Sequence, residues 1–244
     1  MTPYSVLLDL NPQWAWRKNI KTSSTRHLLL KIIVAAAGLA LWGIAASAGT
    51  PPVRILPVGD SITDGSSYSS PGNGGPGGGY RRPLWLMLTN VGYNVDYVGS
   101  LTINPAVDVP MPTHHDGHSG WRIDQIDALL ASVFGQIADP DVLLLMIGTN
   151  DFGQGYDVQN ATNRLDALIG KIVTNRPYCK VIVASLTVRG APYEANIQTN
   201  FNNSVPVIVS NHQARGEQVF FTDMHSALPL SDFPDSLHPN TKAM

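Results

Sequence analysis

Between residues 53 and 222, this sequence alternates short apolar runs with stretches whose apolar residues recur at helical spacing. The run at 142–147 is apolar throughout, which is typical of a strand covered on both faces. A chain in which strands and helices alternate folds as a parallel sheet between two layers of helices. We therefore expect an α/β fold, a three-layer α/β/α sandwich, in one domain over residues 53–244. Its five strands are predicted at 53–58, 95–100, 142–147, 181–188 and 219–222.

Helices are predicted between these strands from the residues that would begin or interrupt them. Pro83 can open the first helix, and Asp124 lies in the first turn of the second. Asp157 is the expected cap of the third. Residues 193–205 predict a fourth helix, which Pro206 is expected to kink.

Two long polar stretches are predicted to be loops. Residues 66–79 are too rich in glycine for regular structure, and no Gly-Lys-Ser/Thr follows them, so they do not form a phosphate-binding loop. Residues 101–113 are polar and rich in proline. The glycine-rich stretch is either the rim of a cleft or a plain spacer.

The first 48 residues differ from the remainder of the chain. A basic flank precedes an apolar run at 32–44, and Ala46-Ser47-Ala48 matches the small-residue pattern that signal peptidase recognises. The apolar run is short for a membrane span, which needs about 20 residues. We expect a cleaved secretory signal, a linker at 49–52 and an extracellular protein. The alternative is an uncleaved membrane anchor with the catalytic domain outside.

Charge and cysteine content exclude several classes of partner and site. Residues 1–48 hold five of the 16 basic and one of the 18 acidic residues, which leaves 11 basic and 17 acidic ones. That acidic balance argues against nucleic acid or an anionic membrane as a partner, because both select basic surfaces. The single cysteine, Cys179, excludes an intramolecular disulfide and a multi-cysteine metal site. Nothing implies a stable protein partner.

Ser61 is the candidate nucleophile. It follows Gly59-Asp60 at the end of the first predicted strand. Open α/β sheets bind their ligands at the carboxyl ends of the strands, so a serine there is exposed to a crevice. The alternative is an ordinary strand-to-helix turn in which Asp60 or Ser61 caps the helix.

A hydrolytic serine also needs a base, and His238 is the candidate. Asp235 lies three residues before it, which lets one turn hold a carboxylate beside the imidazole. Such a pair also occurs by chance, and the alternative is a surface turn that ends at Pro239.

Two residues are candidates for stabilising an oxyanion. Asn150 follows the third predicted strand, so its amide lies at the same edge as Ser61. Gly120 directly precedes a predicted helix, where a backbone N–H is free to bind an anion. The alternative for both is a role in turn geometry alone.

A polar cluster, His114, His115, Asp116 and His118, raises the question of a metal. Zinc deacetylases use such ligands. Residues this close together on a loop rarely converge on one ion, so we expect no metal and no other cofactor, and His118 is assigned to the cleft or to the support of Gly120.

In this order, the motifs resemble those of the SGNH (GDSL-type) hydrolases over nearly all of residues 53–244. The family blocks correspond to 59–63, Gly120, 148–151 and Asp235 with His238-Pro239. The resemblance implies a flavodoxin-like fold with Ser61 as nucleophile and His238 and Asp235 as base and orienting acid. It also implies an oxyanion hole from the N–H groups of Ser61 and Gly120 and the amide of Asn150.

Within that family, three stretches (79–84, 95–100 and 117–126) are similar to microbial acetylxylan esterases. The expected function is a secreted serine esterase that deacetylates xylan or a related polysaccharide. Three aromatic residues could stack on sugar rings: Tyr80, Trp85 and Trp121. For Trp85, packing in the core is favoured instead. A lipid or thioester acyl hydrolase is the alternative, and a non-catalytic carbohydrate-binding protein is a third. The family usually closes with a helix after His-Pro, whereas this sequence stops six residues beyond His238. Without that helix, one face of the sheet is expected to lose apolar cover.

Overall fold

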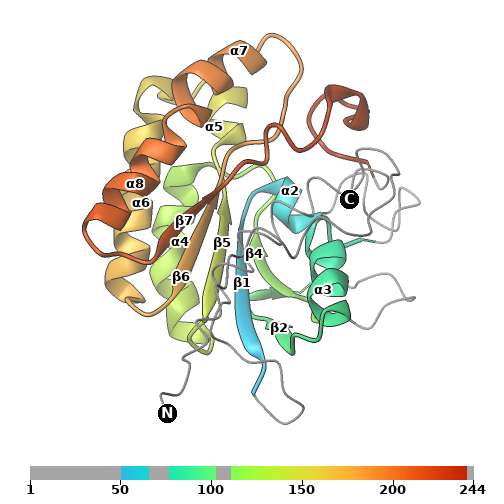
Figure 1. The fold of residues 1–244 in the computed structure, drawn as a ribbon. Coiled ribbons are helices and arrows are strands. Elements are labelled where there is room, and N and C mark those ends of the chain that lie inside the picture. Colours follow the sequence, from blue (N-terminus) through green and yellow to red (C-terminus); the bar gives the residue numbers. More distant parts are fainter. Residues whose placement is uncertain (1–50, 66–76, 103–110, 241–244) are drawn as a thin grey trace, which may run out of the picture.

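The computed structural model describes residues 51–65, 77–102 and 111–240 (Figure 1). A central sheet has the strand order β3-β4-β1-β5-β6-β7, with β2 paired to β1. The α/β class and the mainly parallel sheet are confirmed. The strands are β1 (Val53–Gly59), β2 (Val95–Tyr97), β3 (Leu101–Thr102), β4 (His114–Gly117), β5 (Val142–Met146), β6 (Lys180–Ala184) and β7 (Val219–Thr222).

Two strands share one edge of β1. Residues 53–55 pair in parallel with β2, whereas Val58 and Gly59 pair in parallel with β4. On the other edge of β1, β5, β6 and β7 follow in parallel. The five predicted strands are all present, although β2 and β6 end earlier than expected, at Tyr97 and Ala184.

Strand β4 lies in a region that was predicted to be loop, and β3 pairs antiparallel with it. The sequence prediction is wrong here because β4 carries polar side chains and has no apolar alternation. Some of its buried polar groups have local partners, although His115 Nε2 has no hydrogen-bond partner among the described residues. The Asp116 carboxylate accepts hydrogen bonds from the N–H and hydroxyl of Ser100, and His115 Nδ1 accepts one from the Gly117 N–H.

The helices form layers on the two faces of the sheet. Figure 1 shows α4, α6 and α8 on one side and α3 on the other, with α2 at the carboxyl end of β1. The bounds are α2 (Ser61–Asp64), α3 (Arg81–Asn90), α4 (Ile123–Gln136), α5 (Thr149–Gly153), α6 (Ala161–Asn175), α7 (Glu194–Ile197) and α8 (Val205–Ala214). Short 3₁₀ turns η3 (Val158–Asn160) and η5 (Leu230–Asp232) and a π-helical turn η4 (Gln198–Asn202) complete them.

Asp157 does not cap α6, contrary to the sequence prediction. It has a left-handed backbone with φ 39°, and the turn η3 separates it from α6, which begins at Ala161. Its carboxylate accepts hydrogen bonds from the side chains of Asn160 and Arg164 instead. Side-chain partners therefore replaced the backbone N–H groups that a cap would bind.

Pro206 does not kink a helix either. Residues 194–202 form α7 and the π-helical turn η4, and a new helix, α8, begins at Val205. Pro206 thus lies in the first turn of α8, where the missing N–H has no intrahelical partner to lose.

The core lies on both faces of the sheet, and all five residues of β5 are buried. Among the residues that the structure describes, no helix combines the length and apolar character needed to cross a membrane. The predicted leader at 1–48 lies outside the described residues, as do most of the predicted loop 66–79 and residues 103–110.

Candidate active site

Ser61 begins α2 immediately after β1. Asp60 is the N-cap of that helix, and its Oδ1 accepts a hydrogen bond from the Ile62 N–H at 3.0 Å. The capping interpretation of this turn therefore holds for Asp60. It leaves the hydroxyl of Ser61 free to interact outside the helix, at the carboxyl end of the central strand.

The chain after β7 brings a histidine to that hydroxyl. Figure 1 shows this segment, in red, crossing the carboxyl ends of the strands toward α2. His238 Nε2 lies 2.8 Å from Ser61 Oγ, and His238 Nδ1 lies 2.6 Å from Asp235 Oδ2. The structure thus brings together three candidate residues that the sequence separates by up to 177 positions.

The turn that contains Asp235 is held by its own hydrogen bonds. Asp235 Oδ1 accepts from the N–H groups of Leu237 and His238, at 3.0 and 2.6 Å. Partial burial acts to raise the pKa of Asp235, but the hydrogen bonds from His238 and Leu237 outweigh it and leave the pKa below its usual value. An ionised Asp235 accepts the Nδ1 proton of His238, so Nε2 is free to accept the proton of Ser61.

Asn150 lies in the first turn of α5, next to β1 because β5 pairs with β1. Its Nδ2 donates a hydrogen bond to the Trp121 carbonyl at 2.9 Å. That bond fixes the orientation of the amide and uses one of its two N–H groups. The second N–H remains available to a ligand.

Gly120 lies in the loop that follows β4, and β4 pairs with β1 as β5 does. Its loop is joined to β1, because the His118 N–H donates to the Gly59 carbonyl at 2.9 Å. The φ of Gly120 is +80°, a left-handed conformation that only glycine adopts without strain. Gln154 Nε2 donates to the Gly120 carbonyl at 2.8 Å and ties the loop to the end of α5.

Asp151 holds the two oxyanion elements together, a role that the sequence did not reveal. It is fully buried, and its carboxylate contacts Arg164 at 2.9 Å and the Ile123 N–H at 3.1 Å. Because Ile123 begins α4 just after the Gly120 loop, Asp151 fixes that loop relative to Asn150. Its signal was a charged residue four positions after the end of the apolar run at 142–147.

Arg81 is a second residue whose role the sequence did not reveal. Its buried guanidinium donates to the carbonyls of Thr63, Asp64 and Thr113. Two of those carbonyls lie in the last turn of α2, so Arg81 satisfies acceptors that a helix end leaves unpaired. Burial lowers the pKa of Arg81. The only available signal was its place in the stretch 79–84.

Asp60 is an ionisable group beside the nucleophile. Its carboxyl is 1% exposed, and Oδ2 has no hydrogen-bond partner among the described residues. Burial raises the pKa of Asp60 to about 6, although the bond from the Ile62 N–H acts to lower it. The charged form of this side chain is therefore costly at neutral pH.

The histidine cluster has local partners in the structure. His115 is buried, and burial lowers its pKa to about 4, so it is neutral at pH 7. His118 stacks on Trp121, with ring centroids 4.2 Å apart. Within the described ranges, no group of three or more histidine, cysteine or acidic residues is arranged to hold a metal ion.

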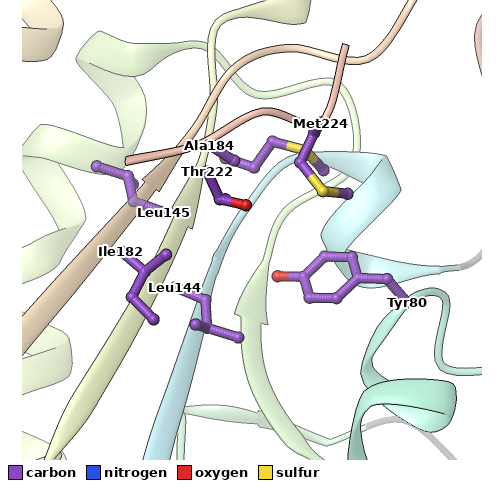
Figure 2. A pocket seen from close by; sticks show the side chains of 8 residues that line it. Tyr80, Leu144, Leu145, Ile182, Ala184, Thr222 and Met224 are labelled. Atoms are coloured by element: carbon purple, nitrogen blue, oxygen red, sulfur yellow. The ribbon is translucent and has the colours of Figure 1, made fainter. Parts of the chain in front are cut away.

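The three aromatic candidates for sugar binding differ in how much of each side chain is exposed. Tyr80 is 5% exposed, so its prediction as a sugar platform is wrong. Figure 2 shows its ring in an apolar pocket on the sheet, whose lining contains none of the five candidate site residues. The pocket lining is Tyr80, Leu144, Leu145, Met146, Ile182, Ala184, Thr222 and Met224.

Trp85 and Trp121 are both partly exposed and pack against the core. Of these, Trp121 lies in the site, because its carbonyl holds Asn150. Of the three aromatic candidates, Trp121 is thus the one whose backbone contacts a candidate catalytic residue, and its ring stacks on His118.

Comparison with known proteins gives a consistent result. The model of the GDSL-like lipase/acylhydrolase family matches residues 58–244. A multidomain esterase of Ruminococcus flavefaciens is 29% identical, with 81% of this chain aligned. The match spans only 27% of that relative, so it concerns one part of a longer protein.

Solved structures of esterases share the fold. A family 3 carbohydrate esterase of Clostridium thermocellum is 30% identical, with a TM-score of 0.67 over 79% of this chain and 92% of the other. A mutant acetyl esterase solved with an acetate ion is 25% identical, with a TM-score of 0.65 over 78% of this chain and 90% of the other.

Proposed function

This chain belongs to the GDSL-like lipase/acylhydrolase family and is a carboxylic ester hydrolase, and on that premise we propose that it removes acetyl groups from xylan or a related polysaccharide. The observation that carries the proposal is the continuous hydrogen-bonded series from Ser61 through His238 to Asp235. Ser61 is the nucleophile, His238 the base, and Asp235 the group that orients His238.

The reaction begins with attack of Ser61 Oγ on the ester carbonyl carbon. A C–O bond forms, and the hydroxyl proton passes to His238 Nε2 across the 2.8 Å hydrogen bond. Asp235 stabilises the resulting imidazolium. The carbonyl oxygen becomes an oxyanion, which accepts hydrogen bonds from the N–H groups of Ser61 and Gly120 and from the amide of Asn150.

Collapse of this intermediate breaks the ester C–O bond. His238 returns its proton to the departing sugar oxygen, and the acetyl group remains on Ser61. Water then attacks the acetyl-enzyme, with His238 as base again, and acetate leaves with regeneration of the Ser61 hydroxyl. The same groups thus serve both half-reactions.

Several features support an acetylated glycan as the substrate. The relatives named above are a multidomain esterase, a carbohydrate esterase and an acetyl esterase. Trp121 is partly exposed beside Asn150, and aromatic rings commonly pack against sugar rings. The loop between β4 and α4, which carries Gly120, has polar residues at Ser119, which is exposed, and Arg122, which is partly exposed, rather than an apolar wall.

The substrate is tested with nitrophenyl esters of increasing chain length and with acetylated xylan. Each extra methylene of the acyl chain contributes up to about 0.8 kcal/mol of binding free energy, but only if it is buried. An open polar site therefore gains little affinity from a longer acyl chain. We expect kcat/KM to fall from acetyl through butyryl to octanoyl esters, and acetate to be released from acetylated xylan. A rise in kcat/KM with chain length would instead indicate the lipid esterase alternative.

The nucleophile is tested by covalent labelling. A fluorophosphonate should modify Ser61, and Ser61→Ala should lose both labelling and most of kcat while keeping its fold. An adduct on another serine, or full turnover by the alanine variant, would refute the mechanism. A catalytically silent carbohydrate-binding protein would show no labelling at all.

Secretion is proposed from the leader sequence. The basic flank, the apolar run and Ala46-Ser47-Ala48 predict cleavage before Gly49. N-terminal sequencing of protein recovered from the medium should give Gly49 as the first residue. Recovery in the membrane fraction with residues 1–48 intact would favour the anchor.

A further inference from the structure

The segment Arg189–Gly190, between β6 and α7, contacts the turn that carries the base. The Gly190 N–H donates a hydrogen bond to the Ser236 carbonyl at 2.9 Å. Ser236 lies between Asp235 and His238 in the chain, so this hydrogen bond contacts the middle of the turn. Asp235 and Ser236 are themselves exposed, whereas Gly190 is buried beneath them.

The packing at Gly190 leaves no space for a side chain. A Cβ at this position would lie 2.6 Å from Ser236 Cβ and 3.0 Å from Ser236 Oγ. Ser236 has a φ of 62°, so its own backbone is in the left-handed region that disfavours a residue with a Cβ. The turn is therefore pressed against the glycine.

The neighbouring residue contacts the other half of the site. Arg189 Nη1 donates to the Thr149 carbonyl at 2.9 Å, and Thr149 directly precedes Asn150. The guanidinium also lies over the ring of Tyr193, 4.1 Å from its centroid. Two consecutive residues thus contact the helix that presents the oxyanion donor and the turn that presents the base.

The Arg189–Gly190 segment is itself held by contacts with Glu194 of α7. The Arg189 N–H donates to Glu194 Oε2 at 2.6 Å, and Glu194 Oε1 pairs with His225, which follows β7. The segment is therefore anchored to α7 and to the chain that leads to the acid–base turn. These contacts hold the segment in one position.

We propose that Arg189–Gly190 is a positioning segment. It holds His238 in the correct position relative to Ser61 and to the oxyanion donor of α5. The proposal rests on the Ser61–His238–Asp235 mechanism given above. Gly190 touches no substrate in this scheme and acts through Ser236 alone. The absence of a side chain at 190 is what lets the turn approach closely enough for the 2.8 Å contact of Ser61 with His238.

The test is the substitution Gly190→Ala, compared with its rescue by Ser236→Gly. Displacement of a catalytic group by about 1 Å costs on the order of 10²-fold in rate, so we expect kcat for nitrophenyl acetate to fall by about that factor with KM unchanged. In the double variant Gly190→Ala/Ser236→Gly the clashing Cβ at 236 is gone, and glycine suits the positive φ. We expect kcat to recover to within about tenfold of the wild type.

Gly170→Ala on α6 is the matched control, because a Cβ there would meet nothing within 4 Å. It should leave kcat and KM unchanged. Ser236→Gly alone is the reference for the double variant, because it isolates the effect of removing the Ser236 side chain. Thermal unfolding of all variants separates misplacement of His238 from loss of fold.

Two results would overturn the inference. Full kcat in Gly190→Ala would show that the turn does not depend on the glycine, and a lowered kcat that Ser236→Gly fails to rescue would show that the defect does not act through Ser236. Neither result bears on the nucleophile. The proposed mechanism fails separately, if Ser61→Ala is active or if the fluorophosphonate labels another serine.

Discussion

The active site consists of two regions that are held in different ways. The strand-end half comprises residues 59–64, 117–122 and 148–154, which follow β1, β4 and β5. Two of its carboxylic acids, Asp60 and Asp151, are 1% and 0% exposed, whereas Asp64 and Arg122 are partly exposed. The acid–base turn comprises residues 235–238, and its Asp235 is exposed at the surface.

The difference lies in what fixes each region. Strand pairing fixes the strand-end half, since Gly59 pairs with Gly117 on one side and with Met146 on the other. The acid–base turn belongs to no strand, and its own hydrogen bonds and the contact with Gly190 hold it. Changes in the turn should therefore affect catalysis alone, whereas changes in the strand-end half should also affect stability.

The largest expected effect is on catalysis, at Asp235. In Asp235→Asn the carboxylate that fixes the His238 tautomer is lost, and kcat should fall by about 10⁴-fold. The melting temperature should change little, because the asparagine Oδ1 can still accept the hydrogen bonds from the N–H groups of Leu237 and His238. A large loss of stability in this variant would contradict the comparison between the two regions.

The second effect is on stability, at Asp151. Asp151→Ala leaves the Ile123 N–H and part of the Arg164 guanidinium unpaired, which should cost about 3–5 kcal/mol in chemical denaturation. Asp157→Asn is the control, since Asp157 pairs with the same Arg164 at an exposed position and asparagine tolerates its left-handed backbone. That control should cost less than about 1 kcal/mol. Equal costs would show that burial does not distinguish the two carboxylates.

Asn150→Ala should lower kcat by about 10²–10³-fold, as loss of one oxyanion donor does. The Trp121 carbonyl also loses its partner in this variant, so a smaller loss of stability should accompany the loss of rate. Steady-state kinetics and thermal unfolding measure the two effects. A rise in KM at constant kcat would show that Asn150 binds the ground state instead.

The smallest expected effect is a pH dependence at Asp60. The ordinary pKa of the carboxyl is 3.8 and that in the folded protein is about 6, so the folded state holds the proton to higher pH. Ionisation above pH 6 therefore costs the folded protein about 3 kcal/mol relative to the unfolded chain. Asparagine keeps the cap on α2 and never ionises.

We thus expect Asp60→Asn to gain stability relative to wild type as the pH rises from 4 to 8, by up to about 3 kcal/mol. Urea denaturation across this range measures the difference. Asp157→Asn, at an exposed carboxylate, is measured alongside as the control. A constant difference between Asp60→Asn and wild type at all pH values would refute the buried-charge account.

Local patterns in the sequence were sufficient for the strand-end half. The apolar runs predicted β1 and β5, and glycine with polar residues after each run placed Ser61 and Asn150 at one sheet edge. The pairing of Asp235 with His238 also followed from spacing alone, because the contact spans only three residues. These features are local, so the sequence could reveal them.

Features that depend on distant contacts were not predictable in this way. Strand β4 has no apolar pattern and exists because it pairs with β1. Tyr80 was expected at a sugar site, yet packing against the sheet buries it. Asp157 and Pro206 resemble a helix cap and a helix breaker, but the turn η3 separates Asp157 from α6, and Pro206 lies in the first turn of α8.

The sequence by itself determined the α/β class, the serine at the strand end and the local acid–base pair, because short-range periodicity and spacing encode all three. Only the tertiary structure decided that the acid–base turn meets Ser61, that Asp151 and Arg81 are buried supports, and that Gly190 lies under Ser236. Those relations join residues far apart in the chain. Their energies arise from burial and hydrogen bonds that form only when the sheet is assembled.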